Sequence, residues 1–349
     1  MSEEKISVQE NKKMATIRDI SLKCGVSVST VSKVLNGYRE IGEETSKAVM
    51  KTAEELGYVP NSYARQLKLK KSYNIGVLFD TLSVYGLKNE YFAHILAALR
   101  ENASRGGYDI TFIENNIGNR RMTYLEHCKY RNFDGICIVC ADFTNPEVLD
   151  VVNSDFPVVT IDHSFNEAIS VLSDNSGGMR ELTQYIVSMG HKKIAYIHGN
   201  KSSVTHNRLV AFHQVLAEHD IQIPEYYMKE GEYRLAESAE ELTYELLNLT
   251  DRPTCIVASD DYAALGIIKA IKRAGLRFPE DISVAGFDGI SISQALEPKL
   301  TTVKQDTEKL GEHAAKKLIC LMESPMTTPL EHIVLKAELI IGDSVKKLR

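Results

Sequence analysis

The side chains best suited to a specific chemical task lie within one short stretch near the N-terminus. A short hydroxyl, an ammonium or a small apolar group is found at each of its outward positions, Val28, Ser29, Ser32 and Lys33. Hydroxyls and an ammonium can contact base edges and phosphates in the major groove of DNA, and an aliphatic group can contact a thymine methyl. The pattern predicts a DNA-contacting surface, although the ordinary solvated face of a helical hairpin is an alternative.

Two short helices would position this surface on a small domain. The first has two isoleucines on its inner face and is expected to end at Gly25. The second is expected to begin after Ser27, which is a good N-cap, and to end at Asn36-Gly37. Its apolar positions recur at helical spacing, so the residues above point outward. This arrangement is typical of a helix-turn-helix, and residues 44–56 predict a third helix.

A short basic segment follows. Pro60 ends one element, and Asn61 can cap a new helix in which basic side chains flank Leu67. A helix of two turns is too short to be stable alone in water, so we expect it to fold on contact with a partner. We predict a polar, disordered extension over residues 1–13, a helix-turn-helix domain over 14–60, and a hinge helix with its linker over 61–72.

The sequence motifs of residues 15–68 are specific to one family of proteins. In order, it contains T-I-R-D-I, G-V-S-V-S-T-V-S-K-V-L-N and G-Y-V-P-N-x-x-A-R-x-L-K. Together these stretches resemble the LacI/GalR (lactose repressor) family of bacterial transcription regulators. The resemblance is dense over residues 15–68 and continues at lower density to about residue 344.

The resemblance implies that the chain binds double-stranded DNA as a two-fold homodimer on a pseudo-palindromic operator. It also implies that Leu67 inserts into the minor groove, where an apolar wedge unstacks one base step. A packed linker helix is the alternative for Leu67, and a solvated cation is the alternative for Lys33. The residues implied to contact DNA are Thr16, Val28, Ser29, Thr30, Lys33, Asn61, Ala64, Leu67 and Lys68.

Charge is divided unevenly along the chain. Residues 1–72 contain 13 Lys+Arg against 9 Asp+Glu, whereas the whole chain contains 41 against 47 and has a formal net charge of −6. A mildly basic head on an acidic body has the electrostatics to bind phosphates through the head alone.

Several other classes of protein are disfavoured. The sequence has no apolar window long enough to span a membrane and no signal peptide, so its 6 cysteines are expected to be reduced thiols in the cytoplasm. Phosphate-cradling glycine motifs, H-E-x-x-H and G-x-S-x-G are absent, and we predict neither enzyme activity nor a cofactor. Cys137 and Cys140 lie three apart in a strand-like run, where they should face opposite sides and belong to the core rather than to a metal site.

From residue 73 onward, strand-like runs alternate with amphipathic helices, which indicates an α/β fold with doubly wound parallel sheets. The strands form two series, and the resemblance implies a two-lobed body like that of periplasmic sugar-binding proteins. We predict an effector-binding and dimerisation domain over 73–345, with an N-lobe at about 73–172 and 305–336 and a C-lobe at about 173–304 and 337–345. The predicted strands are 75–79, 109–113, 135–140, 158–161, 194–197, 255–258, 282–285, 301–303 and 339–341.

Polar and aromatic side chains near the ends of these strands are candidates for a ligand cleft, because open α/β sheets bind ligands beyond the carboxyl ends of their strands. Carboxylates and an arginine can bond pairs of hydroxyls, and aromatic rings can cover the apolar face of a sugar. The candidate effector-binding residues are Asp80, Tyr91, Phe92, His163, Arg208, Tyr233, Asp260 and Asp288. In the resembled family, Arg208, Tyr233, Asp260 and Asp288 match positions that contact the effector, and Tyr91-Phe92 match an aromatic pair.

Alternatives remain for individual residues. Asp288 could be a helix cap, and Arg208 could belong to a surface ion pair. We expect Asp261 to be the N-cap of a helix over 262–274. The segment 81–90 is longer than the usual family connection and lacks its Asn-Pro-Phe, so the identity of the effector does not carry over.

These features predict a sequence-specific repressor whose operator affinity is controlled by a small molecule, a sugar rather than a purine, bound between the lobes. A cytoplasmic solute-binding protein, or a regulator controlled by a protein partner, is the alternative. Because the chain ends too soon after residue 342 for a leucine-heptad helix, we expect a dimer rather than a tetramer.

Overall fold

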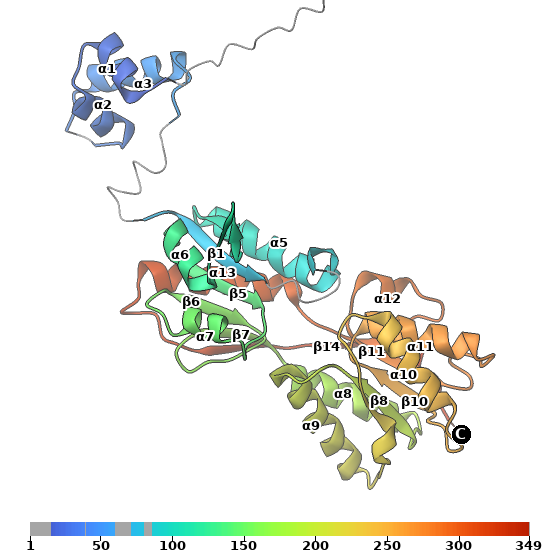
Figure 1. Cartoon of the computed structure of the whole chain (residues 1–349). Helices are drawn as coiled ribbons and strands as arrows, with labels where there is room; N and C mark the ends of the chain where they lie inside the picture. Colours follow the sequence, from blue (N-terminus) through green and yellow to red (C-terminus); the bar gives the residue numbers. More distant parts are fainter. Residues whose placement is uncertain (1–14, 39, 60–70, 80–85, 349) are drawn as a thin grey trace, which may run out of the picture. The chain divides into compact units, whose positions relative to one another are not determined.

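The computed structural model describes residues 15–38, 40–59, 71–79 and 86–348 and divides the chain into two compact units, Met1–Ser72 and Tyr73–Arg349. Figure 1 shows both units with their helices and strands labelled. The predictions for residues 1–13, for Asn61, Ala64, Leu67 and Lys68 of the hinge, for Asp80, and for the first half of the 81–90 segment lie outside the described residues.

The first unit contains three helices, α1 (Ile17–Cys24), α2 (Val28–Leu35) and α3 (Glu43–Glu55). Ser27 caps α2 as predicted, with its hydroxyl accepting from the Thr30 amide. Gly25 ends α1 in the left-handed conformation, at φ 65°, which favours glycine. The predicted third helix is displaced by one residue at each end. A small core of Ile20, Val31, Val34, Val49 and Ala53 holds the three helices together.

The second unit contains two six-stranded sheets. The first has the order β13-β7-β6-β5-β1-β2, and the pairings along it are all parallel. Helices α5 (Glu90–Arg105) and α13 (Thr307–Glu323) cover one face, and α6 (Tyr124–Arg131) and α7 (Pro146–Val152) cover the other. Its strands are β1 (Asn74–Phe79), β2 (Asp109–Phe112), β5 (Gly135–Cys140), β6 (Val158–Ile161), β7 (Ile169–Ser173) and β13 (His332–Leu335).

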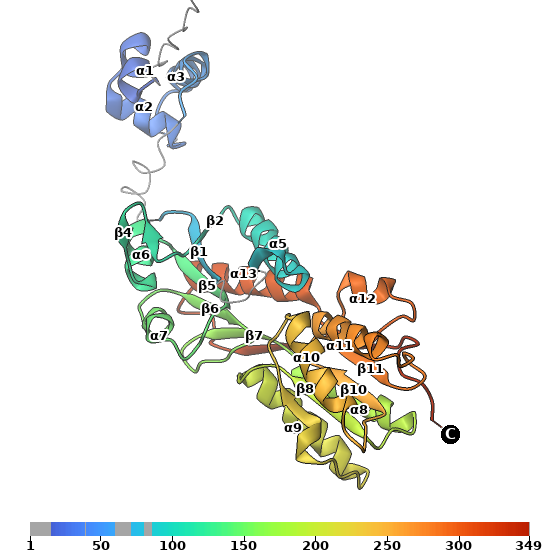
Figure 2. The ribbon, with the colours of Figure 1, turned by 45° about the vertical axis from the view of Figure 1, so that its right-hand side comes forward.

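The second sheet has the order β14-β12-β11-β10-β8-β9. Helices α8 (Asn175–Ser188) and α9 (Ser203–Glu218) cover one face, and α10 (Ala236–Leu247) and α11 (Asp261–Arg273) cover the other. Its strands are β8 (Ile194–His198), β9 (Met228–Glu230), β10 (Cys255–Ala258), β11 (Ser283–Asp288), β12 (Thr301–Lys304) and β14 (Glu338–Ile340). Figure 2 shows the helices on both sides of this sheet.

The sheets differ from the prediction at their edges. Strand β14 pairs antiparallel with β12, so the second sheet is not wholly parallel. Strands β7, β9 and β13 were not predicted, and neither was the small hairpin of β3 (Asn116–Ile117) and β4 (Arg120–Arg121). Strands β9 and β13 are short edge strands, whose pairing partners lie far away in the sequence.

The chain passes between the sheets three times, after β7, after β12 and after β13, so each lobe is built from separate segments of sequence. The crossings place the carboxyl ends of several strands, including β6 and β11, toward the junction of the lobes (Figure 1). This junction is therefore where side chains that follow strands in both lobes can meet.

The prediction that Cys137 and Cys140 face opposite sides is wrong. The pairing of β5 with β1 shifts register after Leu78, and this places an extra residue in β5. As a result, Cys140 packs against the same apolar cluster that contains Cys137. Burial raises the pKa of Cys137 to about 12, which keeps it a thiol. In the parts of the chain that the structure describes, no helix is both long and apolar enough to cross a membrane.

Candidate functional site

The outward face of α2 carries the predicted base-contacting side chains. Val28 is 41% exposed, and Ser29 and Lys33 are also exposed. Thr30 is half-buried, and its hydroxyl lies 2.9 Å from that of Ser27. The ammonium of Lys33 lies 3.1 Å from the Glu40 carboxylate in an exposed ion pair. Such a pair contributes little to stability, so Lys33 can exchange Glu40 for another acceptor.

Thr16 has a structural task in the head. Its hydroxyl accepts from the Asp19 amide, and the Asp19 carboxylate accepts from the Thr16 amide at 2.7 Å. This reciprocal capping box begins α1. Thr16 is thus an N-cap of the domain, whatever it contacts on DNA.

Arg208 forms the centre of the polar cluster in the body. It projects from α9 and is 3% exposed. Its Nε donates to Asn175 Oδ1 at 2.7 Å, one Nη donates to the Ser259 carbonyl at 2.8 Å, and the other lies 3.9 Å from Asp288 Oδ1. The guanidinium also stacks on Phe287, with Cζ 3.5 Å from the ring centre. The surface ion pair considered for Arg208 is excluded by this burial.

Asp288 lies at the end of β11 and is not a helix cap. Its backbone is in the left-handed region at φ 105°, and its Oδ1 accepts from Gln305 Nε2 at 2.7 Å. Burial raises the pKa of Asp288 to about 7, an effect that the positive charge of Arg208 opposes and the negative charge of Asp260 assists. Near neutral pH, the Asp288 carboxyl can therefore either donate or accept a hydrogen bond.

Asp260 has the capping role at the start of α11 that was expected of Asp261. Asp260, rather than Asp261, is the N-cap and accepts from the Ala263 amide at 3.0 Å. The other Asp260 oxygen accepts from the Arg234 amide at 2.8 Å, so both oxygens are already bonded. Asp261 is buried and accepts from the Ile290 amide and the Thr302 hydroxyl. The prediction for Asp261 is wrong by one residue, because both aspartates have the local sequence of a cap.

The aromatic candidates gather beside this cluster. The hydroxyl of Tyr233 lies 2.9 Å from that of Thr205, and the Tyr233 ring lies so close to Gly199 that a Cβ there would be 2.0 Å from it. Tyr91 donates to Asp162 Oδ2 at 2.5 Å. Phe92 is only 4% exposed, so its ring face is not open as predicted. Tyr91 and Phe92 lie on the N-lobe, and Tyr233 lies on the C-lobe.

His163 lies at another contact between the lobes. Its ring stacks on Phe143 at 4.1 Å between centres, and its Nδ1 lies 3.3 Å from the Ser203 hydroxyl of the opposite lobe. Burial lowers the pKa of His163, which favours the neutral imidazole. Glu90 joins the lobes at a separate point, accepting from the Ser291 amide at 2.6 Å and from its hydroxyl at 2.7 Å.

Arg234 was missed by the sequence analysis. It follows Tyr233 in a loop, has φ 64°, and places its Cζ 4.3 Å from the centre of the Phe92 ring in the opposite lobe. The predicted site residues are mainly polar residues that come just after strands, and Arg234 follows no strand directly. Its position beside the predicted Tyr233 was the one available signal.

The polar cluster is incomplete as it stands. Among the described residues, the buried side-chain atoms without a hydrogen-bond partner are Asn89 Nδ2, Tyr196 Oη, Arg234 Nε and Gln305 Oε1. Gln305 is bonded to Asp288, and the negative charge of Asp288 acts on Arg234. Arg208 in turn acts electrostatically on Tyr196. Unpartnered buried polar groups cost free energy, so the presence of three of them, in Tyr196, Arg234 and Gln305, beside Arg208 and Asp288 favours a polar ligand that would bond them.

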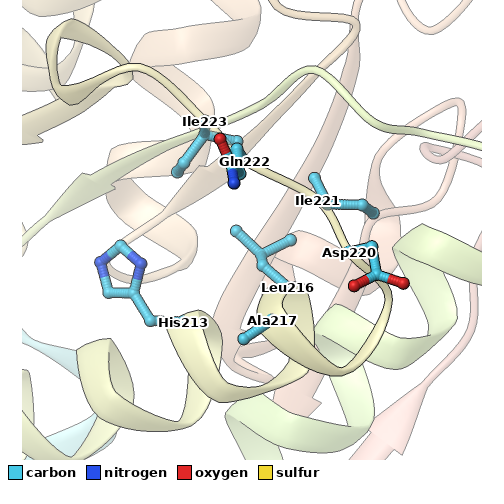
Figure 3. A pocket seen from close by; sticks show the side chains of 7 residues that line it. All are labelled: His213, Leu216, Ala217, Asp220, Ile221, Gln222 and Ile223. Atoms are coloured by element: carbon cyan, nitrogen blue, oxygen red, sulfur yellow. The ribbon is translucent and has the colours of Figure 1, made fainter.

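A cavity of about 700 Å³ adjoins this cluster between the lobes. Its lining includes Tyr91, Asp288, Ser291, Lys304, Gln305 and Lys336. A second hollow, of about 540 Å³, lies on the C-lobe between the last turns of α9 and the segment 220–223 that follows it (Figure 3). It is lined by His213, Leu216, Ala217, Asp220, Ile221, Gln222 and Ile223, and includes none of the predicted site residues. The interlobe cavity is therefore the better candidate site.

Comparison with known proteins gives consistent results for both units. Residues 16–61 match the family model described as bacterial regulatory proteins, lacI family, and residues 183–345 match the periplasmic binding protein-like domain. The chain is 32% identical over 339 residues to the probable HTH-type transcriptional repressor ExuR of Bacillus subtilis (strain 168), covering 96% of this chain and 99% of that protein.

Two solved structures are similar over nearly the whole chain. One is the lac repressor dimer bound to operator and the anti-inducer ONPF, with a TM-score of 0.80, 28% identity, and coverage of 96% of this chain and 100% of that one. The other is the complex of the transcriptional regulator CelR with cellobiose, with a TM-score of 0.69, 25% identity, and coverage of 95% and 99%. Both resemblances extend through the helical head and the two-lobed body.

Proposed function

Because the chain belongs to the LacI family of bacterial regulatory proteins, we propose that it represses transcription by binding a pseudo-palindromic operator as a homodimer, under the control of a sugar bound between its lobes. It is a DNA-binding transcription regulator. The proposal concerns its particular sites and effector. A repressor works where the DNA is, so we also propose that it acts in the cytoplasm.

The exposed face of α2 supports the operator-binding part of the proposal. Val28, Ser29 and Lys33 project from one helix whose other face is fixed in the core by Val31 and Val34. A rigid helix with short hydroxyls and one cation can lie in the major groove without a change of fold. A lac repressor that is 28% identical was solved as a dimer on its operator, which favours the same assembly here.

The incomplete polar cluster is the observation that carries the effector-binding part. Tyr196, Arg234 and Gln305 each have a buried atom without a partner among the described residues, and each interacts with Arg208 or Asp288. Asp288 and Gln305 also line an interlobe cavity. Hydroxyl groups can both donate and accept, so a sugar could bond a carboxyl, a phenol and an amide together. The relative CelR binds cellobiose, which is consistent with a carbohydrate in this place.

The same geometry supports a switch. Glu90 and Ser291 bond across the lobes, as do Ser203 and His163. A ligand between the lobes that prefers one lobe arrangement would shift the population toward it by its difference in affinity for the two. We propose that effector binding changes the spacing of the two heads of the dimer and releases the operator.

The test is a selection of genomic fragments by the purified full chain at near-physiological salt, repeated with a panel of sugars and purines. An enriched pseudo-palindrome whose retention is lost with a sugar is expected. Loss of retention with a purine instead would contradict the sugar assignment. Enrichment that no small molecule alters would contradict the effector-binding part, and absence of enrichment in every condition would contradict the operator-binding part.

A further inference from the structure

Arg234 is a second arginine in the interlobe cleft, and it differs from Arg208 in how its charge is satisfied. It enters from the C-lobe, and its backbone amide is anchored to Asp260 at 2.8 Å. Its Cζ lies 4.3 Å from the ring centre of Phe92 and 5.6 Å from those of Tyr91 and Tyr233. The guanidinium thus lies among three aromatic rings, two from the opposite lobe, within the range of cation–π attraction.

One hydrogen-bond donor of Arg234 is buried without a partner among the described residues, and this is its Nε. By contrast, Nε and one Nη of Arg208 donate to Asn175 and Ser259. The face of the Arg234 guanidinium makes a cation–π contact with Phe92. Its edge, at Nε, has no acceptor among the described residues.

The position of this edge connects it with the effector cavity. Tyr91 lines the cavity and also flanks Arg234. Asp288 lines the cavity as well, and its negative charge acts on Arg234. Arg234 itself is not among the residues that line the cavity, but it lies beside Tyr91 and within electrostatic reach of Asp288, so a ligand that extends past these two side chains would meet its guanidinium.

We propose that Arg234 is a specificity-determining residue that binds a carboxylate of the effector, and that the effector is a sugar acid rather than a neutral sugar. This inference rests on the proposed function and narrows its ligand class. The Nε and one Nη of an arginine form a planar fork that matches the two oxygens of a carboxylate. The sugar hydroxyls would bond the cluster of Asp288, Gln305 and Tyr196, and the carboxylate would bond Arg234.

A carboxylate fits this place better than a phosphate does. Asp260 and Asp288 both lie close enough to act on Arg234, and their charges repel a second anion. Burial keeps the Asp288 carboxyl partly protonated near neutral pH, which lets the site accept one added negative charge. A phosphate carries nearly two charges at neutral pH and would meet stronger repulsion.

The test measures binding by the full-length protein with calorimetry. The probes are galacturonate paired with galactose, glucuronate and gluconate paired with glucose, and glucose 6-phosphate. The variants are Arg234→Met, which keeps the apolar stem, and Arg234→Lys, which keeps the charge without the fork. Arg277→Met is the matched control, because Arg277 lies on the same lobe in an exposed ion pair with Asp281.

The wild type is expected to bind at least one sugar acid more tightly than the paired neutral sugar. Arg234→Met is expected to weaken that acid about tenfold to a hundredfold, the usual loss for a hydrogen-bonded charge pair, while the neutral sugar changes less than twofold. Arg234→Lys should restore part of the affinity, and Arg277→Met should bind as the wild type does.

Two outcomes would overturn the assignment while leaving the proposed function intact. One is tight binding of a neutral sugar with no preference for its acid. The other is an Arg234-dependent preference for glucose 6-phosphate. If no probe binds and no sugar releases the selected operator fragments, both the assignment and the effector part of the proposed function fail.

Discussion

The head and the interlobe cleft solve the problem of placing functional side chains in opposite ways. On α2, the candidate side chains come from a single helix, are exposed, and make few bonds to one another. In the cleft, Arg208 and Asp288 come from positions 80 residues apart, are buried, and lie 3.9 Å from each other, and each is hydrogen-bonded to further residues. The difference teaches that substitutions on α2 should act singly on DNA binding, whereas each substitution in the cleft should disturb stability and ligand binding together.

The largest expected effect is that of Arg208→Ala. It leaves the carbonyl of Ser259, the amide oxygen of Asn175 and the Asp288 carboxyl without their buried partner. Breaking such a buried ionic cluster costs about 3–5 kcal/mol of unfolding free energy, and the effector response should be lost with it. Urea unfolding of the full chain measures the first effect, and operator release measures the second.

Arg277→Ala is the control for this change, because Arg277 pairs with Asp281 at the surface. It should alter the unfolding free energy by less than about 0.5 kcal/mol. Equal losses of unfolding free energy from Arg208→Ala and Arg277→Ala would mean that the buried contacts of the cleft contribute no more to stability than a surface ion pair does.

The next effect should appear in the pH dependence of stability. The pKa of Asp288 is about 7 in the folded chain, against about 4 for an ordinary aspartate, so the folded state binds this proton more tightly than the unfolded state does. Stability relative to Asp288→Asn should therefore fall as pH rises from about 4 to about 7, and stay level above that. Urea unfolding of both proteins across this range measures the difference.

Asp260, Asp261, Arg208 and Arg234 also face this group, and they remain in both proteins, so the difference isolates Asp288. A difference that does not change with pH would mean that Asp288 has the same pKa in the folded and the unfolded chain. In that case, the cleft would shift the pKa of its carboxyl no more than an exposed position in the head does.

A smaller effect is expected from Ser27→Ala in the head. The Ser27 hydroxyl accepts from the Thr30 amide at 3.0 Å, and loss of an N-cap costs about 1 kcal/mol. Hydrogen exchange of the buried amides in α1 and α2 reports this loss for the head alone. Ser29→Ala, two residues along on the exposed face, should leave protection unchanged or raise it slightly. Equal loss of hydrogen-exchange protection in Ser27→Ala and Ser29→Ala would contradict the expectation that each substitution in the head acts on its own contacts alone.

The smallest effect on stability is expected from Lys33→Met. Its pair with Glu40 is exposed, so the unfolding free energy should change by less than about 0.5 kcal/mol. If Lys33 contacts a base edge, affinity for the selected operator should nevertheless fall about tenfold or more. Lys23→Met on α1, which removes a similar ion pair with Glu55 of α3, is the control and should bind the operator normally. Unchanged affinity for Lys33→Met would remove Lys33 from the interface.

Local signals made the head predictable. The Ser27 cap, the left-handed Gly25 and the spacing of Val31 and Val34 all act within one or two turns of helix, and the sequence shows them directly. In the body, the buried central strands could be predicted for the same reason. Edge strands such as β13 could not, because a four-residue segment becomes a strand only when Ile169–Ser173 lies beside it.

The cleft shows where prediction from the sequence ended. That Arg208 and Asp288 could meet follows from the common edge at which parallel strands end. Three other features do not follow from the sequence. Arg208 donates to Asn175 and Ser259. Asp260 rather than Asp261 caps α11, and Arg234 stacks on Phe92. Each of these depends on distances between segments that are far apart in the chain.

By itself, the sequence determined the helical head, the alternation of strands and helices, and the family to which the chain belongs, because these depend on nearest-neighbour periodicity and local motifs. Only the tertiary structure decided which polar atoms are bonded and which are left without partners. Burial makes an unpartnered donor costly, and burial is a property of the packed lobes. Arg208 and Arg234 are the same residue type in the sequence, and only packing leaves the Nε of Arg234 without an acceptor among the described residues.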